Sequence, residues 1–257
     1  MIFNALGRTL RVETDSEAIL AIAADTFGRF GPAEPIASPD ITLRLPAGSL
    51  LANPATFRSE VLLFGFLSQL REHGLMAVHG AAVVRDGPAI LLRGPSGSGK
   101  TTLAYAAARS RFQALAEDVV WIDLATGLWR GMPWFFHLLP DAPRLFPELA
   151  GLPEVPGSAG KIKLEVDLDS IRPGSTVTEA GPGPIVLLER GAGRGSVLEH
   201  LDLSEALEIW RRCPAGTEES FPGYDRHVEA LLKSGAWRLQ LGTNLEGALK
   251  LLETLPR

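Results

Sequence analysis

The stretch AILLRGPSGSGKTTLAYAAAR, residues 89–109, joins an apolar run to a glycine-rich turn and then to an alanine-rich run. Its residues 94–101, GPSGSGKT, match the phosphate-loop pattern G-x-x-x-x-G-K-[ST]. This pattern needs a strand before it and a helix after it, because backbone N–H groups and the positive end of the helix must converge on one anion. AILLR predicts the strand and TTLAYAAARS predicts the helix. The stretch therefore predicts a nucleotide-phosphate site.

Each residue type in the loop suits ATP and Mg²⁺. Gly97 and Gly99 allow the backbone to approach phosphate closely, Lys100 is expected to reach the β and γ phosphates, and the Thr101 hydroxyl is expected to bind Mg²⁺. Nothing nearby reads the base, so ATP, GTP and pyrophosphate all remain open as donors. The expected nucleotide contacts are Gly94, Pro95, Ser96, Gly97, Ser98, Gly99, Lys100, Thr101 and Thr102.

Two further features flank the loop. His79, in VHGAAV, precedes Gly94, and the acidic pair Glu117-Asp118, in LAEDVV, follows Lys100. Phosphoryl transfer needs the charge of the γ phosphate neutralised and a carboxylate to orient or deprotonate the acceptor hydroxyl. Neighbouring side chains on a strand point to opposite faces, so both carboxylates can serve one site only if the strand ends or bends there.

The order HG, hairpin, GPSGSGKT, helix and acidic pair resembles the catalytic core of bacterial HPr serine kinase/phosphorylase and its kinase relatives, which include kinases of lasso-peptide precursors. The resemblance spans about residues 76–123. It implies that His79 lies beside the γ phosphate and that the acidic pair divides metal binding from proton removal at a serine hydroxyl. We expect Glu117 to be the base and Asp118 to bind the metal. The relatives also assemble as oligomers, which implies a homo-oligomer.

Three departures from the family pattern narrow this interpretation. The family usually has Asp where this chain has Glu117, so the two acidic roles can also be exchanged. The glycine-rich segment linked to dephosphorylation and hexamer assembly is absent after the acidic pair. Residues 1–75 do not resemble the large N-terminal domain of the carbohydrate-regulating enzymes. We therefore expect a serine kinase without strong phosphorylase activity, acting on a peptide or small protein such as a lasso-peptide precursor.

Other candidate residues are weaker. Lys161 is a candidate cation for the transferring phosphoryl group, with a solvated strand face as the alternative. The aromatic stretch WFFHLL, residues 134–139, suits a lid, a peptide-docking surface or ordinary core. His137, His200 and His227 show no metal-ligand spacing.

Two rival functions remain. In a switch ATPase, Asp123 or Glu189 would end the metal-binding strand, and ATP would be hydrolysed without an acceptor. In a regulatory module, the chain would bind nucleotide without catalysis. Amide replacements of Glu117 and Asp118 would then leave the ATP affinity intact, and there would be no activity to lose.

Composition excludes several classes of partner and site. The chain has 257 residues, 46% of them hydrophobic, and 25 basic against 30 acidic side chains give a net charge of −5. A net negative charge gives no overall electrostatic attraction to nucleic acid or to an anionic membrane. Cys213 is the single cysteine, so an internal disulfide and a paired-thiolate zinc site are excluded. No apolar run is long enough to span a bilayer, and we expect a cytoplasmic protein.

The patterning predicts an α/β protein. A small N-terminal α+β region is expected over residues 1–75, with a helix over 53–74, and an HPr kinase-like phosphate-loop domain over 76–257. Strands and helices do not alternate strictly, so its sheet is expected to be mixed and largely antiparallel. Within it we expect one strand over 114–123 and a long proline-rich loop or lid over 127–160.

Overall fold

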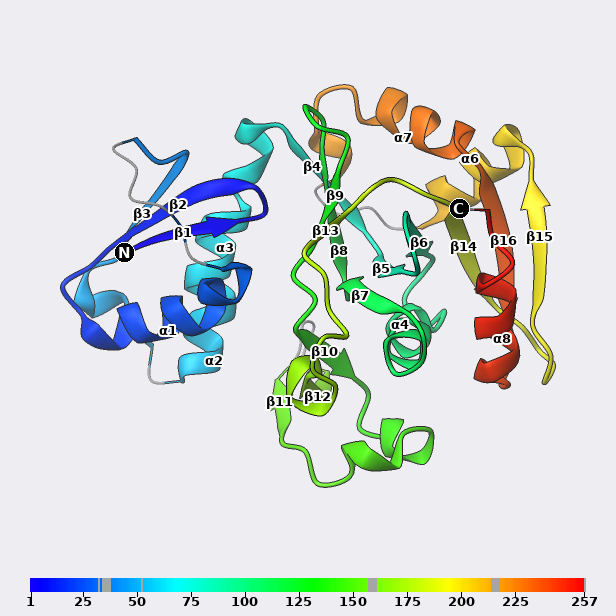
Figure 1. Ribbon diagram of the computed structural model, residues 1–257, viewed down its shortest axis with the longest axis horizontal. Coiled ribbons are helices and arrows are strands. Elements are labelled where there is room, and N and C mark those ends of the chain that lie inside the picture. Colours follow the sequence, from blue (N-terminus) through cyan, green and yellow to red (C-terminus); the bar gives the residue numbers. More distant parts are fainter. Residues whose placement is uncertain (32, 34–37, 52, 157–160, 214–217, 257) are drawn as a thin grey trace. The chain divides into compact units, whose positions relative to one another are not determined.

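The structure is a computed structural model that describes residues 1–31, 33, 38–51, 53–156, 161–213 and 218–256 (Figure 1). It divides into two compact units, Met1–Met76 and Ala77–Arg257. The sequence pattern predicted a boundary after residue 75. The segment GSAG, residues 157–160, lies outside the described residues.

The first unit contains a three-stranded sheet in the order β1-β2-β3, with β1 antiparallel and β3 parallel to β2. The side chain of Ser16 caps the first helix by accepting the backbone N–H of Ile19, as an N-cap serine does. Phe27, near the end of that helix, packs its ring 5.6 Å from Phe3 and 5.2 Å from Phe66. The elements are β1 (Ile2–Ala5), β2 (Arg8–Glu13), α1 (Glu17–Phe27) and β3 (Ile41–Arg44).

The helix expected over 53–74 is present but not uniform. It passes through α2 (Pro54–Thr56), a π-helical segment (Phe57–Leu63), α3 (Phe64–Leu67) and a 3₁₀ turn (Leu70–His73). Gly74 then ends it in the left-handed region at φ 77°. Periodicity predicted the length of this segment, whereas the changes of winding leave no distinct pattern in the sequence.

The second unit is built on a six-stranded mixed sheet in the order β15-β16-β14-β6-β5-β7. Strand β14 is parallel to β6 and β16, and the other pairs are antiparallel, so the mixed α/β prediction is confirmed. Strand β15 was not predicted from the sequence, because it is an edge strand whose side chains are mostly exposed. The strands are β5 (Ala81–Val84), β6 (Ala89–Arg93), β7 (Gln113–Ala116), β14 (Ile185–Arg190), β15 (Val197–Leu201) and β16 (Ala236–Leu241).

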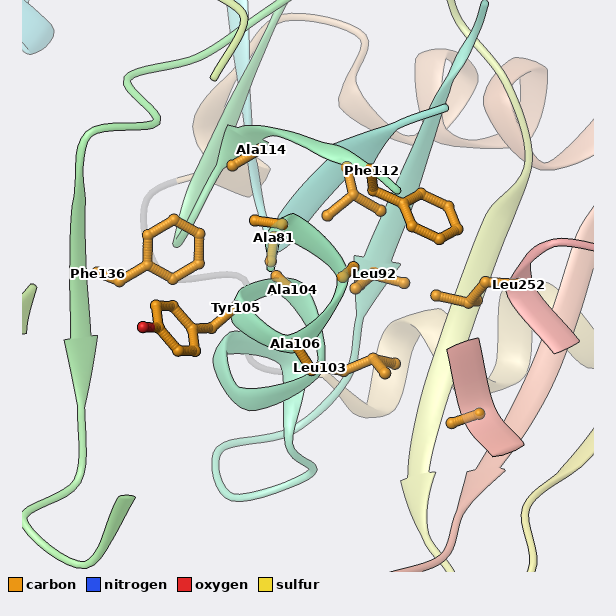
Figure 2. Close-up of a cluster of buried hydrophobic side chains, with 14 of the residues drawn as sticks. Ala81, Leu92, Leu103, Ala104, Tyr105, Ala106, Phe112, Ala114, Phe136 and Leu252 are labelled. Carbon is orange, nitrogen blue, oxygen red and sulfur yellow. The ribbon is translucent and has the colours of Figure 1, made fainter. Parts of the chain in front are cut away.

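One face of this sheet carries the main hydrophobic core. Helices α4 (Lys100–Ala108) and α8 (Leu245–Leu252) pack there against alternate residues of the strands. Figure 2 shows Leu103 and Leu252 on one side of α4, and Tyr105 beside Phe136 on the other. Helices α6 (Leu203–Arg212) and α7 (Tyr224–Lys233) pack against each other, and α6 contacts β14 and β16 with buried residues outside this core cluster. They therefore cover the other face.

Two smaller sheets flank the phosphate-loop region, and both correct the sequence analysis. The expected strand over 114–123 is two strands, because β7 ends at Ala116 in the six-stranded sheet and β8 (Val119–Asp123) begins in another. That second sheet has the order β13-β9-β8-β4. It contains β4 (Leu75–His79), β9 (Trp129–Arg130) and β13 (Glu179–Ala180).

The proline-rich stretch 127–160 was expected to be a loop or lid, and its described part also forms strands. Strand β10 (Phe135–Leu138) and β11 (Glu154–Pro156) both pair antiparallel with β12 (Ile162–Asp167). The prolines lie largely between these short strands or at their ends, where a missing backbone N–H costs little. Phe136 and Leu138 are buried against α4, so β10 is part of the core. The short helix α5 (Leu168–Ile171) follows β12.

Gly131 allows β9 to pass close to β7. A Cβ atom at this position would lie 1.8 Å from the backbone oxygen of Leu115, which is sterically impossible without backbone movement. We expect Gly131→Ala to destabilise the second unit by about 3 kcal/mol. The matched control is Gly181→Ala, since a Cβ there meets nothing within 4 Å. Urea unfolding monitored by circular dichroism measures both; equal midpoints for the two variants would contradict this packing.

Candidate active site

The glycine-rich loop lies between β6 and α4, so the predicted strand, loop and helix are all confirmed. Gly97 and Gly99 adopt φ values of 82° and 100°, in the left-handed region that glycine favours. The Lys100 Nζ donates to the backbone oxygens of Gly94 at 2.7 Å and Pro95 at 3.1 Å. Burial lowers the pKa of Lys100. The lysine therefore folds across the loop, with the loop's own carbonyls holding its ammonium group.

The acidic pair lies in the turn between β7 and β8, where the chain leaves one sheet for another. The Thr101 hydroxyl, at the start of α4, donates to Glu117 Oε1 at 2.9 Å. The Asp118 Oδ1 lies 3.3 Å from His79 Nδ1, and its backbone oxygen accepts the N–H of Gly80 at 2.8 Å. The requirement that the strand end at the pair is met. The two carboxylates thus face different partners at one site.

This geometry favours the exchange of the two expected acidic roles. Glu117 contacts Thr101, the residue whose hydroxyl was expected to bind Mg²⁺, and the side chain of Glu117 is only 12% exposed. The side chain of Asp118 is 61% exposed, so an incoming hydroxyl can reach it. A general base must meet the proton that it removes, whereas a metal ligand is better held in place by neighbouring groups. Glu117 therefore suits the metal side and Asp118 the base.

A histidine that the sequence analysis set aside holds Glu117 from the other side. His137, on β10, lies with Nδ1 3.5 Å from Glu117 Oε2 and Nε2 3.3 Å from Glu165 Oε2 of β12. Hydrogen bonds to Glu117 and Glu165 raise the pKa of His137 to about 9. The pairing of β10 with β12 places His137 opposite Glu165, and Glu117 joins them from the turn between β7 and β8. The three residues are far apart in sequence, so no spacing signal could have found them.

The remaining candidate residues, a lysine and the two carboxylates of the switch-ATPase hypothesis, lie in different surroundings. Lys161 is exposed, directly before β12. Lys163 reaches the site instead, where its Nζ donates to the backbone oxygen of His137 at 3.3 Å. Asp123 accepts backbone N–H groups of its own turn and pairs with Arg130 at 3.5 Å. Glu189 pairs with Arg238 at 3.8 Å. Both carboxylates proposed for a switch ATPase are therefore engaged in local structure.

A buried ion pair between Glu218 and Arg93 contacts the backbone of His79. The sequence did not predict this pair. Glu218 accepts the backbone N–H of His79 and pairs with Arg93 Nη1 at 3.1 Å. Arg93 Nη1 also donates to the backbone oxygen of His79 at 2.9 Å. The Tyr224 hydroxyl donates to Glu218 at 3.0 Å, and Trp210 Nε1 donates to that hydroxyl at 3.1 Å. Since Arg93 directly precedes Gly94, this network joins His79 to the phosphate loop.

The site residues fit a phosphate-bound Mg²⁺. This ion usually takes one or two protein oxygen ligands and otherwise binds waters and substrate phosphates. The Thr101 hydroxyl and the Glu117 carboxylate, 2.9 Å apart beside the loop, supply such a pair. No group of three or more His, Cys, Asp or Glu side chains within the described ranges forms a metal site. The arrangement therefore suits a metal that arrives with a nucleotide.

Comparison with known proteins adds one structural likeness. No protein-family model and no curated protein matches the chain. A solved structure, the Hpr(Ser) kinase/phosphatase from Coxiella burnetii, aligns with 70% of this chain and 87% of its own, at 12% sequence identity and a TM-score of 0.34. A likeness at this level does not determine what this chain binds or does, so the site's own geometry has to indicate the chemistry.

The position of His137 between two carboxylates predicts its titration. In metal-free protein we expect its imidazole to titrate at about pH 9 by NMR, because both carboxylates favour the charged form. The resulting stabilisation is complete below about pH 6.5 and is lost as the pH rises through about 9. Glu165→Gln should lower the midpoint, because it removes one of the two carboxylates. A wild-type midpoint near 6.5 would contradict the bridging geometry.

Proposed function

We propose that this protein is an ATP- and Mg²⁺-dependent kinase that transfers the γ-phosphoryl group to a hydroxyl, namely a serine of a peptide or small protein. One observation supports this above the others. Beside a phosphate loop, two adjacent carboxylates diverge, one to the Thr101 hydroxyl and the other to His79 at an exposed position. A kinase needs both functions within one site: a carboxylate on the metal side and a carboxylate open to the acceptor.

In the proposed reaction the acceptor oxygen attacks the γ phosphorus, and the bond from that phosphorus to the β–γ bridging oxygen breaks, which releases ADP. Asp118 takes the proton of the acceptor hydroxyl, and His79 at 3.3 Å orients the Asp118 carboxylate. Lys100 leaves the loop carbonyls to neutralise charge on the β and γ phosphates. Thr101 and Glu117 would hold Mg²⁺, which would supply positive charge to the phosphate oxygens.

The finer assignments rest on the motifs in the sequence. The likeness of residues 76–123 to HPr kinase relatives supports a serine acceptor, and the lasso-precursor kinases among them support a precursor peptide. A homo-oligomer is proposed on the same basis. A cytoplasmic location is proposed from the composition, since the chain has a single cysteine and no long apolar run. Across the part of the chain that is described, no helix is both long and apolar enough to cross a bilayer.

The first test is mass spectrometry of serine-containing peptides and HPr after incubation with Mg-ATP. We expect the wild-type protein to add one phosphate to a serine and Lys100→Ala to abolish the addition, because the loop loses its only side-chain cation for the β and γ phosphates. Glu154→Gln, an exposed change on β11, serves as the control that keeps activity. ATP consumption without any phosphorylated acceptor, abolished by Lys100→Ala, would favour the switch ATPase instead.

A second test separates the two acidic roles. Asp118→Asn should retain binding of Mg-ATP and lower the transfer rate by about 100- to 10,000-fold, since it removes the base. Glu117→Gln should raise the Mg²⁺ concentration at half-maximal rate by at least about 10-fold, since it removes a metal ligand. Activity titrations against Mg²⁺ at fixed ATP measure both. The reverse pattern would restore Glu117 as base, whereas unchanged ATP affinity in both variants, with no transfer activity in the wild type, would support a regulatory module.

A further inference from the structure

Three parallel strands end at the edge of the sheet that carries the phosphate loop. Strand β14 is parallel to both β6 and β16, so the carboxyl ends of all three lie at one edge. The phosphate loop follows β6, and a second glycine-rich stretch, RGAGRG, residues 190–195, starts at the last residue of β14. Ligands of α/β sheets bind outside the carboxyl ends of parallel strands. The mechanism proposed above uses no residue of this second stretch.

The second stretch is fixed to the end of β16. The N–H of Gly191 donates to the backbone oxygen of Leu241 at 2.9 Å. The N–H of Gly242 donates to Ser196 Oγ at 3.0 Å, and a Cβ atom at Gly242 would lie only 2.3 Å from the backbone oxygen of Gly195. Hydrogen bonds at both ends of the stretch, together with this close backbone approach, therefore fix the path of the chain after β14.

Arg190, the first residue of this stretch, lies against the phosphate loop. It is paired in register with Leu241 of β16. A Cβ atom built on Gly99 would lie 2.6 Å from Leu241 Cδ2 and 3.9 Å from Arg190 Nη1. Gly99 is the last glycine of the loop and directly precedes Lys100. The Arg190 guanidinium is thus close to the part of the loop at which α4 begins.

The side chain of Arg190 is exposed and available to a ligand. Across the described ranges it makes no hydrogen bond, ion pair or ring contact. Two other cations near the site are engaged: Arg93 pairs with Glu218 at 3.1 Å, and Lys163 donates to the backbone oxygen of His137 at 3.3 Å. Arg190 can therefore turn toward a bound anion without breaking a contact within the protein.

The charges around the loop leave a use for a further cation. Glu117 and Asp118 bring two negative charges, and Lys100 brings one positive charge. A charge on His137 is matched by Glu165. A nucleoside triphosphate remains negative after it binds one Mg²⁺, so one lysine does not offset both the acidic pair and the phosphates. An arginine suits this deficit, because its planar donors pair with two phosphate oxygens at once.

The order of the strands indicates which phosphate Arg190 meets. Strand β6, which leads into the loop, lies between β14 and β5, and β7, which ends at the acidic pair, lies beyond β5. Arg190 and the acidic pair are therefore on opposite sides of the loop. The γ phosphate has to lie beside the acidic pair for transfer, so the rest of the donor, with its α phosphate, extends toward β14.

We propose that Arg190 binds the α phosphate of the donor and so selects a nucleoside triphosphate over pyrophosphate, which lacks a third phosphate. This inference rests on the proposed kinase function for the identity of the ligand. Lys100 then holds the β and γ phosphates, and Arg190 holds the phosphate that joins the nucleoside. ATP and GTP share this phosphate, so Arg190 does not distinguish between them.

Calorimetric titration of the full chain in the presence of Mg²⁺ tests the binding without any acceptor. We expect Arg190→Ala to weaken ATP binding at least about 10-fold, because a charge-assisted contact is lost, and to change pyrophosphate binding less than about 2-fold. The matched control is Arg212→Ala, which removes the same charge from α6, where Arg212 pairs with Glu208, and should change neither. Thermal unfolding checks that each variant is folded. Unchanged ATP affinity in Arg190→Ala, or equal losses for ATP and pyrophosphate, would overturn the proposal.

Inorganic tripolyphosphate separates a phosphate contact from a nucleoside contact. It keeps three phosphates without a nucleoside, so Arg190→Ala should weaken its binding about as much as that of ATP. A loss for ATP alone would place Arg190 on the nucleoside and overturn the phosphate assignment.

The transfer assay separates this proposal from the proposed function. With a phosphorylated serine peptide as the readout, Arg190→Ala should raise the KM for ATP at least about 10-fold, and Arg190→Lys, which keeps a positive charge, should recover part of that loss. An unchanged KM for ATP would count against Arg190. ATP binding that depends on Arg190, without transfer to any peptide, would instead refute the kinase and leave the phosphate contact.

Discussion

The site depends on one structural constraint: adjacent carboxylates on a regular strand point to opposite faces and cannot act at one place. The chain meets this constraint by ending β7 at Ala116 and starting β8 at Val119 in a different sheet. The turn between them directs Glu117 to Thr101 and Asp118 to His79. The departure from one sheet to another is therefore what brings both acidic groups to the phosphate loop.

The two acidic groups are held by different kinds of neighbour, which suits the different tasks proposed for them. Glu117 is mostly buried between Thr101 and His137, and His137 is in turn held by Glu165. A carboxylate with partners on both oxygens keeps one orientation, as a metal ligand requires. Asp118 is open to solvent and has the His79 imidazole at 3.3 Å. An exposed carboxylate is free to meet an acceptor that arrives from outside.

The sequence predicted the local parts of this arrangement and missed the long-range parts. The strand, glycine loop and helix over 89–109 are encoded in one continuous stretch, and so is the acidic pair. His137 reaches Glu165 because β10 pairs with β12, its contact with Glu117 joins residues 20 positions apart, and Glu218 reaches His79 across 139 positions of sequence. The edge strand β15 lacks the apolar alternation that marks half-buried strands. Contacts that depend on the assembled sheets leave no spacing that periodicity could detect.

The same long-range packing explains why a buried arginine lies beside the phosphate loop. Breaking a buried ion pair is costly because it leaves one charge unpaired, so Glu218 and Arg93 have to be retained together. Structural support of His79 accounts for Nη1 of Arg93, which contacts both Glu218 and the His79 backbone oxygen. It does not account for Nε and Nη2, which have no partner among the described residues. The Trp210 ring, whose centroid lies 4.0 Å from Arg93 Cζ, stacks on the planar guanidinium, and this contact favours arginine over lysine at the position.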